Sequence, residues 1–469
     1  MASAGEMQHS AGNDEARRAE EGLARPRMPT RVYYLDPGLR TNVGHYANYC
    51  RYIVGELRGR GVEVLVFAHR DILLSLQKEL GAVAHFQIHT HTPFVTWDGW
   101  RGWLADFATY CRHFPSVPQR SSGAYRARSG WRAWRGWLTR FAALADTTLH
   151  DLRSLPAPRF DDLVILTDAR PAHLWALLQW RRSLPRSRRP AFVAEPIKTG
   201  LRLEQTTDGI RAAMPDPRLD PTAAIFRYLS SRFPREPDAR FHLVTFAKST
   251  GDLFKMLLRY PVHTLPLPYR AVAPLRNRAG ARPIVVAILG FQRAEKGYDR
   301  MPEIVTQLLR SIPEIRVLIQ NPDPLGLQET QQSLREIAAN SDRVILEEVP
   351  ADGARWIQLL GMSDLVLCPH RTSFYMSFSS VVAEALANGI PVVVPAGTPL
   401  EAQLEACGRP GAAFARFDPA SIAETTKQVL AEFDRFATAA HQAAVRWPET
   451  NGPARLVDRT ISLIANAEA

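Results

Sequence analysis

Several features that would fix the class of this 469-residue chain are missing from it. Its four cysteines are widely scattered and form no CxxC pair, which favours free thiols in a reducing cytoplasm over a disulfide scaffold. No run approaches the ~18–20 consecutive apolar residues that a membrane-spanning helix needs. Residues 1–28 are polar and lack an apolar core, so we expect a disordered tail rather than a secretory signal.

Lysine is also scarce. The formal net charge is +11, yet only six of the 58 basic residues are lysine. Arginine accompanied by abundant Ala and Pro is typical of a GC-rich genome, and no recognised nucleic-acid-binding module occurs, so the charge does not by itself indicate a nucleic acid partner. The charge is uneven, because residues 97–153 hold nine Arg against four Asp. We expect any acidic partner to dock there.

The C-terminal half alternates predicted strands and helices. Pro283–Leu289 is a continuous apolar run, as expected of a strand buried on both faces. Apolar side chains then recur at helical spacing over residues 301–312. The order repeats to residue 417, with a strand at Ile315–Gln320 and a helix at Gln328–Ala339 among its members. Short crossovers between buried strands predict a parallel sheet with helices on both faces.

The N-terminal half repeats this alternation with longer insertions. Its predicted strands are Arg31–Asp36, Val62–Ala68, Val83–His89, Leu163–Asp168, Ala191–Glu195 and Phe241–Ala247. Leu203–Pro221 is predicted to be a loop. The fold class is therefore α/β, with two Rossmann-like doubly wound parallel-sheet domains facing a central cleft, where ligands bind at the carboxyl ends of strands.

These patterns also give domain boundaries. We predict an N-terminal domain with a Trp- and Arg-rich helical insertion, a Pro-rich linker, a C-terminal domain, and a last helix that crosses back onto the first domain. The N-terminal domain spans residues 29–262 and contains the insertion at 97–155. The linker spans 263–282, the C-terminal domain 283–446 and the last helix 447–469.

One candidate site is the segment Gly290-Phe-Gln-Arg-Ala-Glu-Lys-Gly297, between a predicted strand and an amphipathic helix. A loop in this position presents backbone N–H groups and the positive end of a helix. Arg293 and Lys296 add positive charge where a diphosphate would sit. The alternative is a turn between glycines with solvated charges.

A second candidate site is the loop of residues 368–380, which enters a helix containing Glu384. Its hydroxyl side chains can bind phosphate and sugar oxygens; they are Thr372, Ser373, Ser377, Ser379 and Ser380. Glu384 stands one turn beyond Ser380, where a carboxylate can accept both hydroxyls of a ribose. Alternatively, the serines cap the helix and Glu384 is a solvated charge.

The N-terminal half contributes polar groups to the predicted cleft. Gly44 and His45 follow the first strand at the start of a helix, and Asp168 and Glu195 end two neighbouring strands. We expect these residues to face a ligand in the cleft, with the two carboxylates near hydroxyl groups. The alternatives are an ordinary turn, and carboxylates that cap helices or form salt bridges.

No pattern in the sequence indicates a metal site. Metal-bound diphosphates commonly use an Asp-x-Asp pair, and none occurs. The spacing of His85, His89 and His91 is loosely that of metal ligands, but no cysteine or acidic cluster adjoins them. We therefore expect cationic side chains and a helix N-terminus to bind the phosphates without a metal ion.

Together, these motifs resemble the GT-B glycosyltransferases of the glycosyl transferases group 1 type, a family of retaining enzymes. Gly290, Lys296 and Gly297 match the family's glycine, charged loop and Lys-Gly pair. The run Glu384-Ala-Leu-Ala-Asn-Gly-Ile-Pro-Val-Val matches its "EAMAcGlPVV" segment. Gly397-Thr-Pro-Leu-Glu401 matches the "GgipE" that follows. The resemblance is good over residues 283–417 and weak but consistent over 31–247.

The chain departs from this family at positions that normally contact the transferred sugar. Met376 stands where the family keeps the first Glu of a paired-glutamate motif, and Ser377 stands where it keeps a Gly. Glu195 stands where the family often has a histidine, after the matching strand of the N-terminal domain. Phe291 takes the place of an arginine, for which Arg293 can substitute. The donor sugar is therefore left open.

The resemblance implies a hexosyltransferase-type enzyme that moves a sugar from a nucleotide-diphosphate donor to a glycan or lipid-linked acceptor in cell-surface polysaccharide or glycoconjugate synthesis. Arg293, Lys296, Glu195 and Asp168 are its expected catalytic residues. The resemblance also implies that Gly44 and His45 approach the donor phosphates, that Asp168 and Glu195 lie near sugar or acceptor hydroxyls, and that the N-terminal domain is the acceptor side. The donor is a co-substrate, and no cofactor is expected. The alternative is a catalytically reduced GT-B protein that binds sugar nucleotides or a partner.

The Trp- and Arg-rich insertion bears on location. Basic helices that carry Trp suit an anionic membrane surface, so we expect a cytoplasmic protein that can lie at the inner face of the membrane. Alternatively, these helices cover the first sheet, or their tryptophans line a sugar groove.

Overall fold

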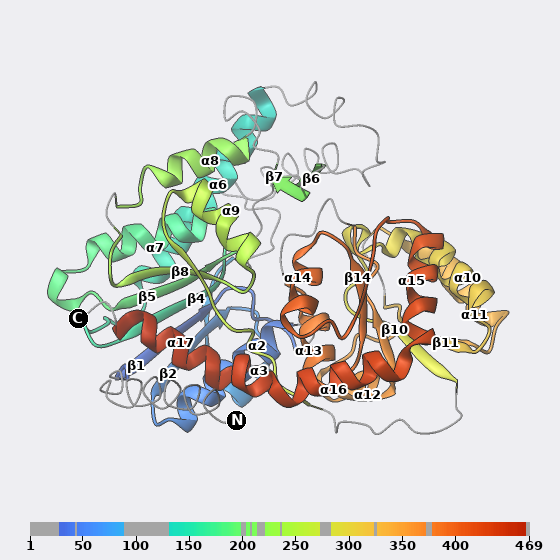
Figure 1. The fold of residues 1–469 in the computed structure, drawn as a ribbon. Coiled ribbons are helices and arrows are strands. Elements are labelled where there is room, and N and C mark those ends of the chain that lie inside the picture. The colour runs from blue at the N-terminus through green and yellow to red at the C-terminus, as the bar shows by residue number, and fades with distance from the viewer. Residues whose placement is uncertain are drawn as a thin grey trace, which may run out of the picture.

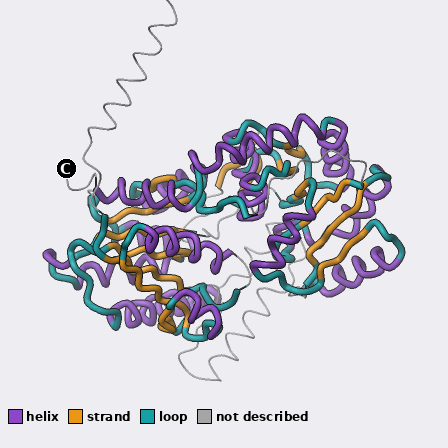
Figure 2. The backbone as a smooth tube through the Cα atoms, turned by 90° about the horizontal axis from the view of Figure 1, so that it is seen from below, coloured by secondary structure: helices purple, strands orange, loops and turns teal. Residues whose placement is uncertain are grey.

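The protein consists of two α/β lobes, seen side by side in Figures 1 and 2. The structure, a computed structural model, describes residues 28–42, 45–88, 131–197, 203–206, 209–212, 221–234, 237–272, 283–322, 326–371 and 378–465. Side chains are not described for residues 45, 131–140, 203–206, 209–212, 221–224 and 295.

The N-terminal lobe is built on a parallel sheet in the order β3-β2-β1-β4-β5-β8-β9. Its strands are β1 (Arg31–Asp36), β2 (Glu63–His69), β3 (Ala82–Phe86), β4 (Leu163–Ala169), β5 (Ala191–Pro196), β8 (Phe241–Thr245) and β9 (Val262–Thr264). The helices are α2 (His45–Gly59), α3 (Leu74–Leu80), α6 (Trp131–Arg153), α7 (Pro171–Ser183), the short η1 (Arg186–Arg188), α8 (Pro221–Ser230) and α9 (Lys248–Leu258). Every residue of β4 is buried, as its apolar sequence predicts.

The C-terminal lobe has a parallel sheet in the order β12-β11-β10-β13-β14-β15. Its strands are β10 (Ile284–Ile288), β11 (Ile315–Gln320), β12 (Val344–Glu347), β13 (Leu365–Leu367), β14 (Val392–Pro395) and β15 (Gly411–Phe414). The helices are η2 (Ala294–Lys296), η3 (Tyr298–Arg300), α10 (Met301–Ser311), α11 (Gln328–Ala339), α12 (Gly353–Met362), α13 (Ser380–Ala387), α14 (Pro399–Ala406), α15 (Pro419–Ala431), α16 (Phe433–Thr450) and α17 (Pro453–Ala465).

The predicted fold class is confirmed, with two local differences. The stretch Leu203–Pro221, predicted as a loop, instead contains the antiparallel pair β6 (Leu203–Thr206) and β7 (Gly209–Ala212) and the first residue of α8. Strand β9 lies at the start of the Pro-rich stretch and pairs with β8. Both differences involve strands of three or four residues, too short to show a hydrophobic period.

The two lobes meet at the carboxyl ends of their strands. Phe246 directly follows β8, Phe378 lies just before α13, and their rings pack edge to face with centroids 5.0 Å apart. Phe378 also lies against Tyr269 of the connecting segment. One apolar core runs through this contact, because it includes Val32 of the first sheet and Val285 of the second. The ligand-binding edges of the two sheets therefore face one another.

The end of the chain returns to the first lobe, as predicted. Helix α17 packs on α2 (Figure 1), and Arg60, directly after α2, forms an ion pair with Asp458 of α17. At the turn between α16 and α17, the Gly452 N–H donates to the Leu267 carbonyl at 2.7 Å. The buried indole of Trp447 donates to the Tyr269 carbonyl at 2.6 Å. These bonds fasten the returning helix to the segment that connects the lobes.

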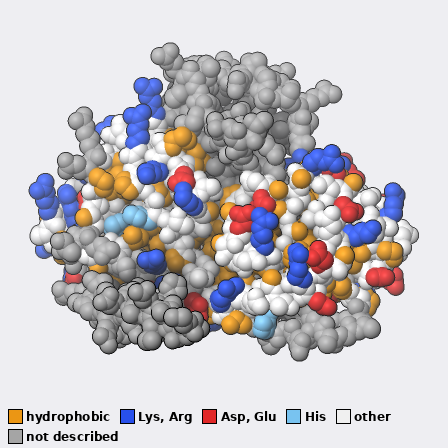
Figure 3. Space-filling view, viewed as in Figure 1, with side chains coloured by type: hydrophobic (Ala, Val, Ile, Leu, Met, Phe, Trp, Pro, Cys, Tyr) orange, Lys and Arg blue, Asp and Glu red, His pale blue; other side chains and the backbone are white. Residues whose placement is uncertain are grey.

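Positively charged side chains are dispersed over the described surface. On the face seen in Figure 3, Lys and Arg side chains are spread over both lobes among other residue types. None of the helices within the described ranges is long and apolar enough to cross a membrane. Most of the Trp- and Arg-rich insertion lies outside those ranges, so its predicted docking role stays a prediction.

Replacing Trp447 tests the fastening of α16 to the connecting segment. Trp447→Phe keeps an aromatic ring but leaves the buried Tyr269 carbonyl without its donor, which should destabilise the protein by about 1–3 kcal/mol. Val445→Ala on the same helix, at a side chain 59% exposed, should change stability by less than about 0.5 kcal/mol. Urea unfolding of both variants measures the difference, and equal midpoints would refute the assignment.

Candidate functional site

The two predicted loops of the C-terminal lobe leave the same point of its sheet. Strand β10 lies beside β13, but the chain continues from β10 to β11 on one side and from β13 to β14 on the other. Loops that diverge in this way open a crevice at the carboxyl ends of the strands, where α/β sheets bind ligands. The segments 290–297 and 368–379 border this switch point.

The loop after β10 is fixed by glutamines. The Gly290 N–H donates to Gln320 Oε1 at 2.6 Å, and Gln292 Nε2 donates to the Gly290 and Gln320 carbonyls. The amphipathic helix α10 begins only at Met301, after the short turns η2 and η3. The Gly290 N–H is therefore already paired within the protein, and the positive charge of this loop lies in its side chains.

Gly297 brings the loop against the segment after β13. Its backbone has φ +77°, and a Cβ there would lie 2.0 Å from the Pro369 carbonyl oxygen. Arg371 holds the same contact from the other side, since its guanidinium pairs with Asp299 and donates to the Ala294 carbonyl. Only glycine fits at position 297, and the two loops form one unit.

Lys296 lies inside this unit. Its Nζ is 3.3 Å from where a Cβ on Gly290 would stand. The buried His370 has its pKa lowered well below its usual value by desolvation and then by the charge of Lys296. Burial raises the pKa of the Cys368 thiol to about 12, and Lys296 opposes that shift. An ammonium group is therefore placed at the carboxyl ends of β10 and β13.

Arg293 lies in the same loop and is half-buried, as Lys296 is. Its guanidinium carbon is 5.8 Å from the centre of the Phe291 ring, and the Phe291 side chain is 46% exposed. Arg293 also precedes η2 and accepts two backbone hydrogen bonds at its carbonyl, from Lys296 and Tyr298. The loop thus carries two half-buried cations, Arg293 and Lys296.

Glu384 is not a solvated charge. It lies on α13, is 3% exposed, and accepts a hydrogen bond at Oε2 from the indole N–H of Trp356 on α12. Desolvation raises the pKa of Glu384 to about 8, although the bond from Trp356 works against that shift. Its predicted contact with a ribose stays a prediction.

The hydroxyl residues are only partly within the described ranges. Ser379 caps α13, because its side chain accepts from the Val382 N–H at 3.4 Å, and Ser380 is the first residue of that helix. The other three hydroxyl candidates, Thr372, Ser373 and Ser377, lie outside the described residues. So does Gly44, while His45 begins α2 with its side chain undescribed.

In the N-terminal lobe, three carboxyl groups gather at the equivalent switch point. Asp36 ends β1, Asp168 lies in β4 with φ +52°, and Glu195 lies in β5; the three strands are adjacent in the sheet. All three side chains are buried. Desolvation, then the charge of Asp168, raises the pKa of Asp36 to about 8 and that of Glu195 well above its usual value. The structure thus brings together the two predicted carboxylates and adds a third.

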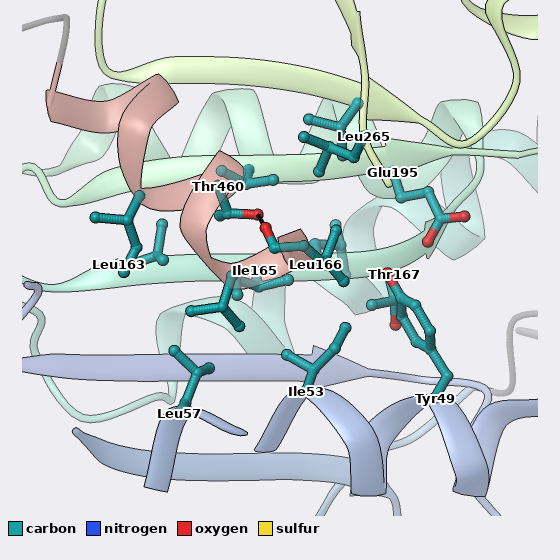
Figure 4. A pocket seen from close by; sticks show the side chains of 15 residues that line it. Tyr49, Ile53, Leu57, Leu163, Ile165, Leu166, Thr167, Glu195, Leu265 and Thr460 are labelled. Carbon is teal, nitrogen blue, oxygen red and sulfur yellow. Dashed lines mark hydrogen bonds between the residues drawn. The ribbon is translucent and has the colours of Figure 1, made fainter. Parts of the chain in front are cut away.

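A narrow cavity runs from the carboxyl group of Glu195 into the N-terminal lobe. Figure 4 shows Glu195, Thr167 and Tyr49 at one end and Leu57 and Leu163 at the other. Helix α17 closes one wall, and the cavity of about 20 Å³ is large enough for one water molecule. No group of His, Cys, Asp or Glu side chains in the described ranges is arranged to hold a metal ion.

Three residues of these sites were not predicted from the sequence. Asp36 and Gln320 each end a strand, so the strand-end rule applied to Asp168 and Glu195 would have found them. Trp356 reaches Glu384 from a different helix, 28 residues earlier in the chain. No local pattern predicts that contact, because it depends on how α12 and α13 pack.

Gly297 and Gly326 have the same φ angle, so they give a matched test of the contact between Gly297 and Pro369. Gly297→Ala should be strongly destabilising, because it adds a collision with the Pro369 carbonyl to the strain of a positive φ. Gly326→Ala also sits at φ +77° but meets nothing within 4 Å, so it should cost only about 1–2 kcal/mol. Thermal unfolding compares them, and equal losses would show that the close approach is not a constraint.

Asp36 should make stability depend on pH. Between about pH 4 and 8, the folded protein keeps a proton on Asp36 that the unfolded chain has lost, so stability falls as the pH rises through this range. Asp36→Asn can keep the bond from the Gly38 N–H, at 2.9 Å, and removes the titration. The variant should gain stability over the natural protein from pH 4 to pH 8. If the difference in melting temperature between the variant and the natural protein stays constant from pH 4 to pH 8, Asp36 is not buried in its neutral form.

Residues 282–432 match the family described as glycosyl transferases group 1. A search of curated proteins finds no match. Among solved structures, the N-terminal domain of Candida albicans trehalose-6-phosphate phosphatase aligns with a TM-score of 0.58 at 12% identity, over 96% of this chain and 99% of that one.

Two further structures share the fold over similar lengths. Sucrose-phosphate synthase from Thermosynechococcus elongatus aligns with a TM-score of 0.56 at 13% identity, covering 94% of this chain and 99% of that one. Anabaena HepE, solved in complex with UDP and glucose, aligns with a TM-score of 0.54 at 14% identity, covering 92% and 99%. At such identities the likeness shows the fold. The protein therefore has the two-domain GT-B fold, and its residues 282–432 match the group 1 glycosyltransferase family.

Proposed function

We propose that the protein transfers a hexose from a nucleoside-diphosphate donor to a glycan or lipid-linked acceptor, without a metal ion and with retention of anomeric configuration. The observation that carries this proposal is the ammonium group of Lys296 at the switch point of a group 1 glycosyltransferase domain. A fixed cation there is suited to the negative charge of a diphosphate.

Glycosyl transfer requires positive charge beside the leaving diphosphate. As the bond between the sugar and the diphosphate breaks, negative charge grows on the leaving phosphate and positive charge grows on the sugar ring. Lys296 and Arg293 can stabilise the departing diphosphate, with the helix entry at Ser379 as a further positive end. Attack of the acceptor on the same face, with the leaving phosphate as base, would retain the configuration.

The donor side of the proposal rests on the C-terminal lobe. HepE was solved with UDP and glucose bound, and its fold is shared by this chain. In our proposal, Glu384 accepts from the ribose hydroxyls, while Thr372, Ser373, Ser377 and Ser380 contribute to binding phosphate and sugar oxygens. Gly44 and His45 approach the donor phosphates from the other lobe.

The acceptor side of the proposal rests on the N-terminal lobe. Asp168 and Glu195 are buried at the strand ends that face the donor lobe, so we assign them to sugar or acceptor hydroxyls. A cell-surface polysaccharide or glycoconjugate is the proposed product. The proposed location is the cytoplasm, with the basic insertion at the inner face of the membrane.

A second candidate is a catalytically reduced GT-B protein that binds sugar nucleotides or serves a partner. It is favoured by Glu195, which is a buried carboxyl group with a raised pKa where the resembled family often has a histidine. Such a protein would bind nucleotides but neither hydrolyse nor transfer the sugar. Donor hydrolysis, measured by release of the nucleoside diphosphate, separates the two candidates.

Lys296 gives the sharpest test of nucleotide binding. With UDP-, GDP- or dTDP-linked ligands at 100–1,000 times the dissociation constant, the matching ligand should stabilise the protein by roughly 2–4 kcal/mol. Lys296→Ala should abolish this thermal shift. Lys427→Ala removes the same charge from an exposed position on α15 and should leave the shift unchanged.

The same experiment can refute the proposal. If no nucleotide shifts the melting temperature of the natural protein, the donor assignment is wrong. If a nucleotide shifts it equally in Lys296→Ala, the diphosphate lies elsewhere.

A further inference from the structure

The segment from the end of α7 through η1 departs from the general spread of positive charge. Residues 181–189 hold five arginines and no acidic residue. Within the described part of the chain, Arg181 alone among them forms an ion pair, with Asp238. The other four keep an uncompensated positive charge, and all but the last are exposed to solvent: Arg182, Arg186, Arg188 and Arg189.

Backbone carbonyls hold some of these guanidinium groups in place. Arg189 Nε donates to the Leu184 carbonyl at 2.9 Å, and its Nη2 donates to the Arg182 carbonyl at 3.4 Å. Arg182 in turn donates to the carbonyl of Arg232, which follows α8. A carbonyl is neutral, so these bonds restrict the side chains without cancelling their charge. Side chains ordered in advance lose less conformational entropy when they bind a ligand.

A further arginine and two aromatic side chains border this segment. Arg232 is exposed, and its guanidinium carbon lies 4.8 Å from the centre of the Tyr228 ring. The Tyr228 hydroxyl accepts from the indole N–H of Trp175 on α7 at 3.3 Å. Tyr228 is 40% exposed and Trp175 is half-buried. We call the following set the arginine surface: Arg182, Arg186, Arg188, Arg189, Arg232 and Tyr228.

The arginine surface lies at the end of the N-terminal lobe that is remote from the C-terminal lobe. The segment leads directly into β5, and Glu195 lies near the other end of that strand, where the lobes meet. A strand of six residues spans about 20 Å. Figure 1 shows the turn between α7 and β5 at the outer end of the lobe, away from α13 and α14. A ligand bound here therefore leaves the proposed nucleotide site open.

The chemistry of the surface favours an anionic chain of sugars. Guanidinium groups pair with carboxylates through two parallel N–H donors. The partly exposed ring of Tyr228 can pack against the C–H groups on the apolar face of a sugar. A lipid surface is instead bound by apolar side chains that enter it beside basic ones. The segment 181–189 offers only the half-buried Leu184 for that purpose.

We propose that the arginine surface binds an anionic polysaccharide whose sugars carry carboxylate groups. The identity of this chain as the acceptor rests on the proposed function, whereas its binding to the surface does not. Because about 20 Å separate the two ends of β5, an acceptor held at both places is a chain of several sugar units. The surface then retains a growing glycan while the end of that glycan lies between the lobes.

The test titrates galacturonate oligomers into the protein by isothermal titration calorimetry, with maltooligosaccharides of equal length as the neutral counterpart. The natural protein should bind the galacturonate oligomer and not the neutral one, with an affinity that falls as sodium chloride is raised. Arg186→Gln/Arg188→Gln should weaken this binding about tenfold or more. The double variant should keep its melting temperature, because both side chains are exposed.

Arg310→Gln/Arg316→Gln on the C-terminal lobe is the matched control. It removes two exposed charges, and Arg316 also donates to a backbone carbonyl, that of Asp342. This variant should bind the galacturonate oligomer as the natural protein does. Equal weakening in both double variants would reduce the effect to net charge and overturn the proposal.

Three other outcomes would also overturn the proposal. They are failure of the natural protein to bind the galacturonate oligomer, full binding by Arg186→Gln/Arg188→Gln, and tighter binding to phosphatidylglycerol vesicles or polyglutamate than to the glycan. The last result would assign the surface to a membrane or to a protein partner. The thermal shift with nucleotides, measured on the same preparations, tests the proposed function separately and should be unchanged in both double variants.

Discussion

The close approach of Gly297 to the Pro369 carbonyl is the constraint on which the donor-side site depends. It joins the loop after β10 to the segment after β13, and both segments start from the switch point of the C-terminal sheet. Lys296 directly precedes this contact, so the position of its ammonium group follows from it. Arg371 reinforces the junction by donating to the Ala294 carbonyl and pairing with Asp299 of η3. A side chain at position 297 would separate the two segments and displace the cation.

Buried carboxyl groups are the second common feature of the edges where the lobes meet. Asp36 and Glu195 lie in one sheet and Glu384 lies on a helix beside the other, and desolvation is the largest cause of the raised pKa of each. Such groups lower the stability of the free protein at neutral pH. Perturbed carboxyl groups gathered at the switch points of two facing sheets are typical of binding and catalytic sites. The groups that lower stability therefore lie at the same edges of the fold as the proposed binding sites.

Sequence patterns predicted the parts of the fold that depend on a hydrophobic period. Strand β11 and helix α11 begin and end at the predicted residues, because each has a long apolar pattern and clear flanks. The pair of β6 and β7 was missed, since a four-residue strand carries no such pattern. The Gly290 N–H was predicted to face a ligand, but it donates to the side chain of Gln320 at the end of the neighbouring strand β11. Contacts between segments distant in the chain, such as that of Trp356 with Glu384, needed the packing of the whole domain.

The central claim is that the switch point of the C-terminal lobe binds a nucleoside diphosphate. The most direct measurement is a crystal structure of the protein with the best-binding nucleoside diphosphate. We expect the diphosphate beside the side chains of Lys296 and Arg293, with the ribose against Glu384. A nucleotide bound elsewhere, with none of these three side chains in contact with it, would contradict this assignment.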